Sequence, residues 1–262
     1  RRRRRLLIAA LAVFVGMPAA GTVLLVVELL VARGGPELPG PPLVLSGTVG
    51  AERPGPVRRA LWLGDSTAAG VGVGQPDQAL PRLVAAGLNQ PVELTVLAIS
   101  GARVDDVLRD QLPRVTAARP DTGPIDTGPI DTGPIDTVFI SVGANDAVHG
   151  TRTGDFRRRY RRLLDGLPAG AEVVVLGVPD MGAPTRLLQP LRAVAGWRGR
   201  ALDGVIRGLT RHRPRTTYVD IAGPTGPRFR AQPSRYFAAD HYHPNPAGYR
   251  LWTDAVLRDW QP

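Results

Sequence analysis

Cysteine is absent from all 262 residues of the chain. Disulfide bonds and thiolate metal sites are therefore excluded. Aromatic residues are scarce, at 5% of the chain, and they are not interleaved with a cluster of basic residues. This composition argues against a nucleic-acid-binding surface, and we expect no nucleic-acid partner.

Lysine is absent too, so arginine supplies all 33 basic residues, and the formal net charge is +10. Residues 1–40 hold six arginines and two glutamates, a net charge of +4, which leaves +6 for the rest of the chain. Those remaining charges are scattered and form no stripe along the sequence. The folded part of the protein is therefore only moderately basic.

The first five residues are arginines, and an apolar run over 6–32 follows, interrupted only by Glu28. The core of a bilayer needs about 20 apolar residues, which this run exceeds. A cleaved signal peptide has a shorter apolar region and a clear small-x-small site, for which 18–20 is a poor match. We predict a single-pass transmembrane signal anchor over 1–33, with the arginines cytoplasmic and the rest of the chain extracytoplasmic at the cell membrane. If the segment is cleaved, the protein is secreted.

Residues 34–56 are rich in proline and glycine, which predicts a linker. Over residues 57–262, short apolar runs alternate with longer amphipathic segments. The predicted strands are 60–63, 93–99, 137–142, 172–178 and 217–221, and the predicted helices are 77–89, 104–118, 155–166, 188–211 and 246–260. This alternation indicates an α/β domain, a five-stranded parallel sheet covered by helices on both faces. Ligands of such sheets bind beyond the carboxyl ends of the strands, so functional residues should follow predicted strands.

A low-complexity segment interrupts this order once, where the pentapeptide DTGPI repeats over 121–136. A Gly-Pro pair every five residues is incompatible with a regular helix or a central strand. We predict a loop inserted before the third strand, at the amino end of the sheet.

Polar residues and glycines follow the first three predicted strands. Ser66 ends the sequence Gly-Asp-Ser after the first strand, Gly101 follows the second, and Asn145 lies in Gly-Ala-Asn-Asp (143–146) after the third. Each motif alone is compatible with an ordinary turn. Together they predict one cleft, with Ser66 as a nucleophile at a strand-to-helix junction, where the helix dipole would favour developing negative charge.

Asp240 and His243 follow the fifth predicted strand and supply partners for such a nucleophile. Their three-residue spacing lets the carboxylate bind one ring nitrogen while the other nitrogen faces a serine. Asn245 and the proline after it are typical of a helix start, which would hold the imidazole in place. His241 is the competing histidine, and His241 with His243 could instead form a metal pair, although no further histidine cluster or cysteine supports that reading.

The order and wording of these motifs resemble the GDSL/SGNH hydrolase family over about residues 59–262. The matching blocks are Gly-Asp-Ser at 64–66, Gly101, G-x-N-D at 143–146 and D-x-x-H-P at 240–244. The chain departs from the family at Thr67, which replaces the leucine of the family's name, and in the array that precedes the third block. The resemblance implies a flavodoxin-like three-layer α/β/α fold with no metal or cofactor.

We therefore predict a serine esterase that hydrolyses carboxylic esters through an acyl-enzyme intermediate. Ser66 attacks the carbonyl carbon, His243 accepts its proton, and Asp240 orients the imidazole. The amide N–H groups of Ser66 and Gly101 and the side chain of Asn145 form the oxyanion hole. Thr67 is expected to have no catalytic role.

The substrate is less sharply defined by the sequence. The loops expected to form its pockets, 68–75, 179–185 and 224–239, are rich in glycine and proline and carry few large apolar side chains. Small acyl groups on cell-envelope glycans and modest lipid esters both fit this expectation. An acyltransferase with the same triad and a membrane-anchored binding domain without turnover are the alternatives.

Overall fold

The computed structural model describes residues 38, 42–116 and 134–261. The predicted anchor over 1–33 and most of the DTGPI array over 121–136 lie outside the described residues. Within the described ranges, no helix combines the length and the apolar character needed to cross a membrane.

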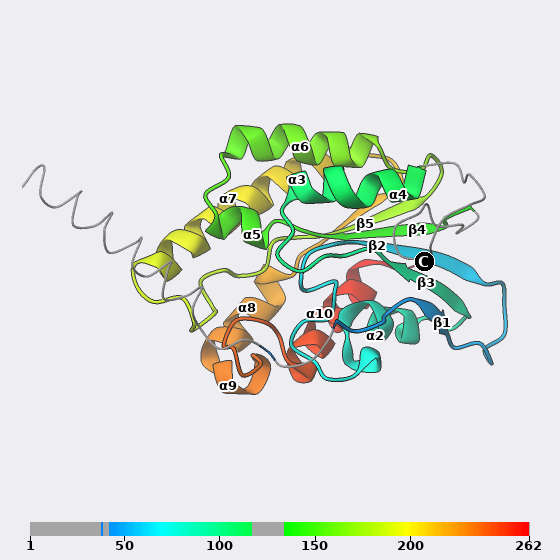
Figure 1. Ribbon diagram of the computed structural model, residues 1–262, viewed down its shortest axis with the longest axis horizontal. Helices are drawn as coiled ribbons and strands as arrows, with labels where there is room; N and C mark the ends of the chain where they lie inside the picture. Colours follow the sequence, from blue (N-terminus) through cyan, green and yellow to red (C-terminus); the bar gives the residue numbers. More distant parts are fainter. Residues whose placement is uncertain (1–37, 39–41, 117–133, 262) are drawn as a thin grey trace, which may run out of the picture.

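A six-stranded sheet forms the centre of the domain (Figure 1). The strands are β1 (Gly47–Val49), β2 (Arg58–Gly64), β3 (Val92–Val96), β4 (Thr137–Ser141), β5 (Glu172–Leu176) and β6 (Thr216–Val219), in the spatial order β1-β3-β2-β4-β5-β6. Strands β2 to β6 pair in parallel, and they are the five strands that the sequence predicted. When these five strands are numbered 1 to 5 in chain order, their order in the sheet is 2-1-3-4-5, which is the flavodoxin-like doubly wound arrangement.

Strand β1 is the sixth strand, and it corrects two predictions. It pairs antiparallel with β3, so the sheet is not wholly parallel. It also lies in the segment 34–56 that the sequence analysis took for a linker. Leu45 is buried there, and Ser46 Oγ accepts a hydrogen bond of 3.0 Å from the amide N–H of Val96. Residues 45–49 therefore belong to the domain, where they cover the edge of β3.

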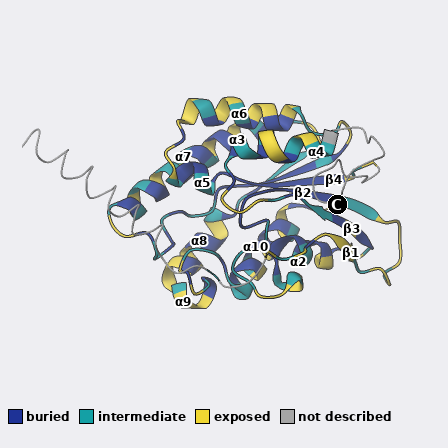
Figure 2. Ribbon diagram, viewed as in Figure 1, coloured by how far each residue is buried: buried dark blue, intermediate teal, exposed yellow. Residues whose placement is uncertain are grey.

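Helices cover both faces of the sheet (Figure 1). One face carries α3 (Val104–Asp106), α4 (Leu112–Thr116), α5 (Ala144–Val148), α6 (Thr153–Asp165) and α7 (Leu191–Thr210), and the other carries α2 (Leu80–Gly87), α8 (Ala222–Ala231), α9 (Pro233–Tyr236) and α10 (Pro246–Asp259). Side chains of β2 alternate between the two layers, with Leu61 and Leu63 in one core and Ala60 and Trp62 in the other. Figure 2 shows the central strands β2, β4 and β5 mostly buried between the helices.

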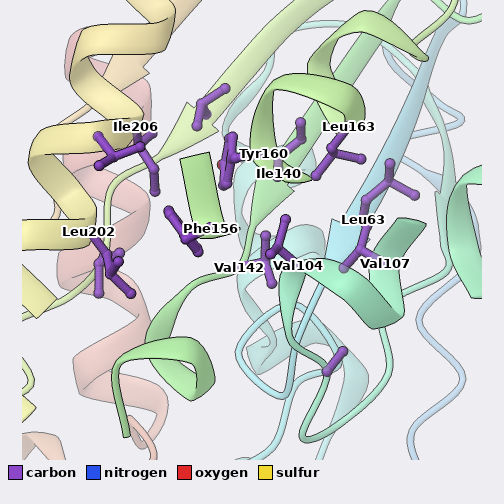
Figure 3. Packing of buried hydrophobic residues seen from close by; sticks show 14 of the residues in the cluster. Leu63, Val104, Val107, Ile140, Val142, Phe156, Tyr160, Leu163, Leu202 and Ile206 are labelled. Carbon is purple, nitrogen blue, oxygen red and sulfur yellow. The ribbon is translucent and has the colours of Figure 1, made fainter. Parts of the chain in front are cut away.

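Helix α6 shows how an arginine-rich segment folds onto the sheet. Phe156, Tyr160 and Leu163 recur at helical spacing and are fully buried against Ile140 of β4 (Figure 3). Burial of each such side chain contributes roughly 1.5–3 kcal/mol. The arginines of α6 occupy its outer face, so the predicted helix over 155–166 is confirmed.

Two helical segments differ from the sequence predictions. The helix expected over 104–118 is present to residue 116, but a widened π turn at Val107–Gln111 interrupts it between α3 and α4. The segment 224–239, expected to be a loop, contains most of α8 and all of α9. Helix α8 forms although Pro227 lies inside it, because Phe229 and its neighbours on the same face are buried against the sheet layer.

Candidate active site

The chain turns sharply at the end of β2, and this turn presents Ser66. A Cβ added at Gly64 would lie 2.2 Å from the carbonyl oxygen of Ser141 on the neighbouring strand β4. Only glycine allows the two backbones to approach this closely. The glycine that begins the Gly-Asp-Ser motif is therefore required by the geometry of the turn.

Ser66 does not begin a helix, contrary to the prediction. The amide N–H of Ala69 donates to the carbonyl of Asp65 at 3.0 Å, and that of Val71 donates to the carbonyl of Ser66 at 2.9 Å, so the chain forms consecutive turns here. The chain becomes helical again only at Pro76, ten positions further on. No helix dipole is therefore directed at the Ser66 side chain from its own segment, and other groups have to stabilise negative charge there.

The carboxylate of Asp65 fixes the same turn from inside. Its Oδ1 atom accepts hydrogen bonds from the amide N–H of Thr67 at 3.0 Å and from Thr67 Oγ1 at 2.8 Å. Burial raises the pKa of Asp65 to about 6, although the hydrogen bonds from Thr67 act in the opposite direction. Thr67 Oγ1 also lies 2.9 Å from Ser141 Oγ. Thr67 therefore helps to hold the residue before it, a role that the sequence analysis did not assign.

Gln111 holds the turn from the opposite side, and the sequence analysis missed it. Its side chain is fully buried on the π turn, where Oε1 accepts from the amide N–H of Gly64 at 2.9 Å and Nε2 donates to the Gly64 carbonyl at 2.8 Å. Turns of this type occur frequently at functional sites. The signal in the sequence was a polar residue in line with Val104 and Val107 on the apolar face of the predicted helix.

Ser66, His243 and Asp240 form a continuous hydrogen-bonded chain. His243 Nε2 lies 2.9 Å from Ser66 Oγ, and His243 Nδ1 lies 2.5 Å from Asp240 Oδ2. The other oxygen of Asp240 accepts from the amide N–H groups of Tyr242 and His243, both at 3.0 Å. Burial opposes ionisation of Asp240, but the hydrogen bonds and the nearby His243 outweigh it and hold the pKa of Asp240 below its usual value. A serine, an imidazole and an ionised carboxylate are thus aligned.

His241, the competing histidine, lies elsewhere. It is exposed, with a backbone φ of +57°, and its amide N–H closes a turn onto the carbonyl of Ala238. Within the part of the chain that the structure describes, no group of three or more acidic or histidine side chains is placed to hold a metal ion. The geometry thus brings His243, and not His241, to Ser66.

Ser66, Gly101 and Asn145, whose N–H groups are the predicted oxyanion donors, line the same pocket. In residues 42–116 and 134–261, the amide N–H groups of Ser66 and Gly101 donate to no backbone carbonyl. The side-chain amide of Asn145 donates one hydrogen to the Ala102 carbonyl at 3.1 Å, which leaves the second free. Gly101 has a φ of +81°, in the left-handed region that glycine favours. The structure therefore brings the predicted oxyanion donors to the same place as the nucleophile.

Asp146 connects the loops that carry these donors. It is completely buried, and Oδ2 accepts a hydrogen bond of 3.0 Å from the amide N–H of Val104. Burial raises the pKa of this carboxyl above its usual value. With the bond from Asn145 to Ala102, this contact ties the start of α5 to the loop that follows β3. The fourth residue of the G-x-N-D motif is thus a structural link between the two donor loops.

Two cavities meet at Ser66. The inner pocket, a narrow cavity of about 40 Å³, is lined mainly by buried apolar side chains. The outer pocket, of about 210 Å³, is lined partly by exposed residues, including Ser100, Gly101 and His149. Ser66, Asn145 and His243 line both pockets, so each one opens directly on the candidate nucleophile.

Large apolar side chains of the inner pocket correct the expectation for the substrate loops. Three aromatic side chains line it, namely Phe229 of α8, Phe237 after α9 and Trp252 of α10. Met181 and Ala183 from the loop after β5 line it too. The segment 224–239 supplies two of these rings because it folds into helices that turn its apolar residues inward. The prediction of pockets with few large apolar groups was wrong for this side of the site.

Comparisons with known proteins agree with this geometry. The family model described as GDSL-like lipase/acylhydrolase matches residues 62–251. A GDSL-like esterase from Mycobacterium tuberculosis is 33% identical over 215 residues, which cover 76% of this chain and 61% of that protein. The match thus spans less than two thirds of the relative's length.

Solved structures share the fold at low sequence identity. A lipolytic protein of the G-D-S-L family from Veillonella parvula superposes with a TM-score of 0.57 at 18% identity, covering 77% of this chain and 97% of its own. Phospholipase A1 from Streptomyces albidoflavus gives a TM-score of 0.56 at 21% identity, covering 78% and 99%.

Proposed function

Because this chain belongs to the GDSL-like lipase/acylhydrolase family, we propose that it is a serine esterase that hydrolyses carboxylic esters. One observation carries the proposal, namely the unbroken hydrogen-bonded chain from Ser66 Oγ through His243 to Asp240. A serine hydroxyl becomes a nucleophile when an adjacent base can accept its proton and a third group orients that base.

In the first half of the reaction, Ser66 Oγ attacks the ester carbonyl carbon while His243 Nε2 takes the hydroxyl proton. The carbonyl double bond opens to an oxyanion, and Asp240 stabilises the imidazolium. When the carbonyl re-forms, the bond to the alcohol oxygen breaks and His243 returns the proton to that oxygen. The products are the free alcohol and an acyl group esterified to Ser66.

In the second half, a water molecule replaces the alcohol beside His243. The imidazole takes one proton from the water as its oxygen attacks the acyl carbon, and it then returns this proton to Ser66 Oγ. The free acid leaves, and the enzyme is regenerated. Both tetrahedral intermediates place their oxyanion toward the N–H groups of Ser66, Gly101 and Asn145, and each preorganised donor of this kind contributes about 2.7–4 kcal/mol.

We propose the cell membrane as the site of action, with the domain outside the cytoplasm. The apolar run over 6–32 and the five arginines before it support this placement. Esters exposed there include acylated glycans of the envelope and lipid esters. Protease accessibility of the domain in intact cells tests the orientation, and full protection from external protease would contradict it.

Replacement of Ser66 is the direct test of the esterase activity. Ser66→Ala should abolish hydrolysis of p-nitrophenyl esters while the melting temperature stays near that of the parent. Ser100→Ala is the matched control, since Ser100 lines the outer pocket but has no bond to His243. Hydrolysis that survives in Ser66→Ala would refute the assignment. Transfer of the acyl group to an added alcohol in preference to water would instead identify an acyltransferase.

A further inference from the structure

The large apolar side chains that are strongly exposed are unevenly distributed over the domain. In the described residues there are five of them, each at least 45% exposed, namely Val44, Val57, Ile99, Leu188 and Trp197. Scattered apolar side chains are ordinary on a protein surface. However, of these five only Val57, directly before β2, lies at the amino end of the sheet. The other four lie at the carboxyl end, as Ser66 does.

Two of the four flank the outer pocket. Ile99 follows β3 and directly precedes Ser100 and Gly101, which line this pocket. Leu188 lies in the segment between β5 and α7, directly after Leu187, which lines the same pocket. Exposed apolar side chains are therefore present on two sides of the cavity that opens on the candidate nucleophile.

Trp197 belongs to a segment that carries positive charge only. Between Asp180 and Asp203 the chain holds four arginines and no acidic residue. The segment includes Leu188 and the first turns of α7, which begins at the carboxyl end of the sheet (Figure 1). Arg200 follows Trp197 by three residues, so the two side chains share one face of the helix. Arg200 is exposed and has no ion pair with any described carboxylate. Exposed tryptophan beside arginine is typical of surfaces that contact the headgroups of anionic lipids.

Val44 shows where the chain enters the domain. Because β1 runs antiparallel to β3, the residues before β1 extend toward the carboxyl end of β3. An added Cβ at Gly70 would lie 3.3 Å from Leu45 Cδ1 and 3.5 Å from Leu43 Cδ1, so this segment packs on the loop that follows the candidate nucleophile. The predicted anchor is followed by 34–41, which can span at most about 29 Å. A tether this short, attached at the carboxyl end, keeps that end near the bilayer.

Given the predicted anchor over 1–33, on which this inference rests, we propose that the carboxyl end of the sheet docks on an anionic lipid bilayer. The outer pocket then opens toward the lipid headgroups. Apolar side chains on separate segments at one end of a domain fit a planar partner, whereas a peptide binds in a groove or along the edge of a sheet. The esters that reach Ser66 are those of lipids at the bilayer surface.

The absence of cysteine makes a single-site test possible with the full chain. Ala193→Cys places a fluorescent label on the exposed face of α7 one turn before Trp197, and Arg211→Cys places it at the exposed opposite end of the same helix, about 27 Å away. Each variant is reconstituted in vesicles of phosphatidylcholine and phosphatidylglycerol that contain a nitroxide-labelled lipid. The label at position 193 should be quenched, and the label at 211 should not.

Three results would overturn the proposal. Absence of quenching at position 193 would show that the domain stands away from the bilayer, and equal or stronger quenching at 211 would show that another face docks. Quenching at 193 that is as strong in vesicles of phosphatidylcholine alone would contradict the role of anionic lipid.

Replacement of the exposed apolar side chains tests the surface itself. In the Ala193→Cys background, Trp197→Ser combined with Leu188→Ser should remove most of the quenching. It should also slow hydrolysis of an ester embedded in the vesicles, while turnover of soluble p-nitrophenyl acetate is kept. Val57→Ser is the matched control, since Val57 is equally apolar and exposed but lies at the amino end. An equal effect of Val57→Ser, or no effect of the double variant, would overturn the proposal.

Failure of the proposed function is distinguishable from failure of this inference. Quenching is measured without substrate, so quenching at position 193 without any hydrolysis that depends on Ser66 would refute the esterase and leave the docking intact. Hydrolysis that depends on Ser66 without quenching at position 193 would refute the docking and leave the esterase intact. If the double serine variant does not fold, as judged by its melting temperature, the two labelled positions on α7 still decide the point.

Discussion

The two ends of the sheet use acidic side chains in different ways. At the amino end, Glu172 pairs with Arg58 at 3.1 Å and Glu93 pairs with Arg59 at 3.2 Å, in partly or largely exposed positions. At the carboxyl end, Asp65, Asp146 and Asp240 are each at most 2% exposed, and each accepts a hydrogen bond from a backbone amide of a loop at the site. Exposed ion pairs contribute about 0–1 kcal/mol, whereas burial of a carboxylate is costly. Buried carboxylates gathered at one end therefore mark the place where geometry matters for function.

Replacement of the histidine at the carboxyl end of the sheet should have the largest effect on activity. His243→Ala removes the base for Ser66 and should lower kcat by roughly 10⁴-fold or more with the fold intact. The matched control is His241→Ala, since this exposed histidine lies two residues away without a bond to Ser66, and it should keep most of the activity. Steady-state kinetics of both variants decide the point, and an inactive His241→Ala with an active His243→Ala would reverse the assignment.

Asn145→Ala should have the next largest effect. In the proposed mechanism the side-chain amide binds the oxyanion more strongly than the ground-state carbonyl, so we expect a loss of about 10²–10³-fold in kcat with little change in KM. Kinetics on one p-nitrophenyl ester measure both constants. A rise in KM at unchanged kcat would make Asn145 a substrate-binding residue and not an oxyanion donor.

Gln111→Met tests the support of the nucleophile turn. This change keeps the volume of the side chain but removes both bonds to Gly64. The buried amide N–H of Gly64 then has no partner, at a cost of about 2 kcal/mol, whereas its carbonyl keeps the bond from the amide N–H of Ile99. Denaturant unfolding measures the loss, and kcat should fall because Ser66 lies two residues from the released backbone. A variant as stable and as active as the parent would show that Gln111 does not hold the turn.

Asp65→Asn probes the cost of a buried carboxylate. A pKa raised to about 6 means that the folded state binds the proton of Asp65 more tightly than the unfolded state does. Protonation of Asp65 therefore stabilises the folded state at low pH, and this contribution is lost as the pH rises through about 6. Between pH 8 and pH 5 the free energy of unfolding of the parent should rise by about 1.4 kcal/mol relative to that of Asp65→Asn. At still lower pH this difference should reach about 3 kcal/mol. Urea unfolding at the two pH values measures the difference, and parallel pH profiles would contradict the raised pKa.

The smallest effect is expected at the amino end. Glu93→Gln removes the partner of Arg59 at an exposed position, and the free energy of unfolding should change by less than about 1 kcal/mol. kcat/KM should not change. If Glu93→Gln lowered activity as much as substitution of a buried carboxylate at the carboxyl end does, the distinction between the two ends of the sheet would be wrong.

Much of this architecture could be predicted because it depends on local patterns. The five parallel strands are apolar runs, and the motifs at Ser66, Gly101, Asn145 and His243 follow strand ends that the topology brings together. Strand β1 could not be predicted, since it has only three residues and owes its pairing to the edge of β3.

Other features depend on contacts that are distant in sequence. The glycine and proline content of 224–239 indicated a loop, yet packing of the buried face of α8 outweighs the cost of Pro227 inside this helix. The bidentate contact of Gln111 with Gly64 joins residues 47 positions apart. Ser66 was predicted to lie at a strand-to-helix junction, but the residues that follow it form turns, and the next helical residue is Pro76.

Trapping the acyl-enzyme tests most directly whether this end of the sheet makes Ser66 a nucleophile. The protein is mixed with p-nitrophenyl octanoate, quenched in acid during turnover and digested with trypsin. The peptide between Arg59 and Arg82 contains Ser66 as its single serine. We predict an octanoyl mass increase on Ser66 in the parent and none in Ser66→Ala. Turnover without an adduct on this peptide, or an adduct on another residue, would contradict the account.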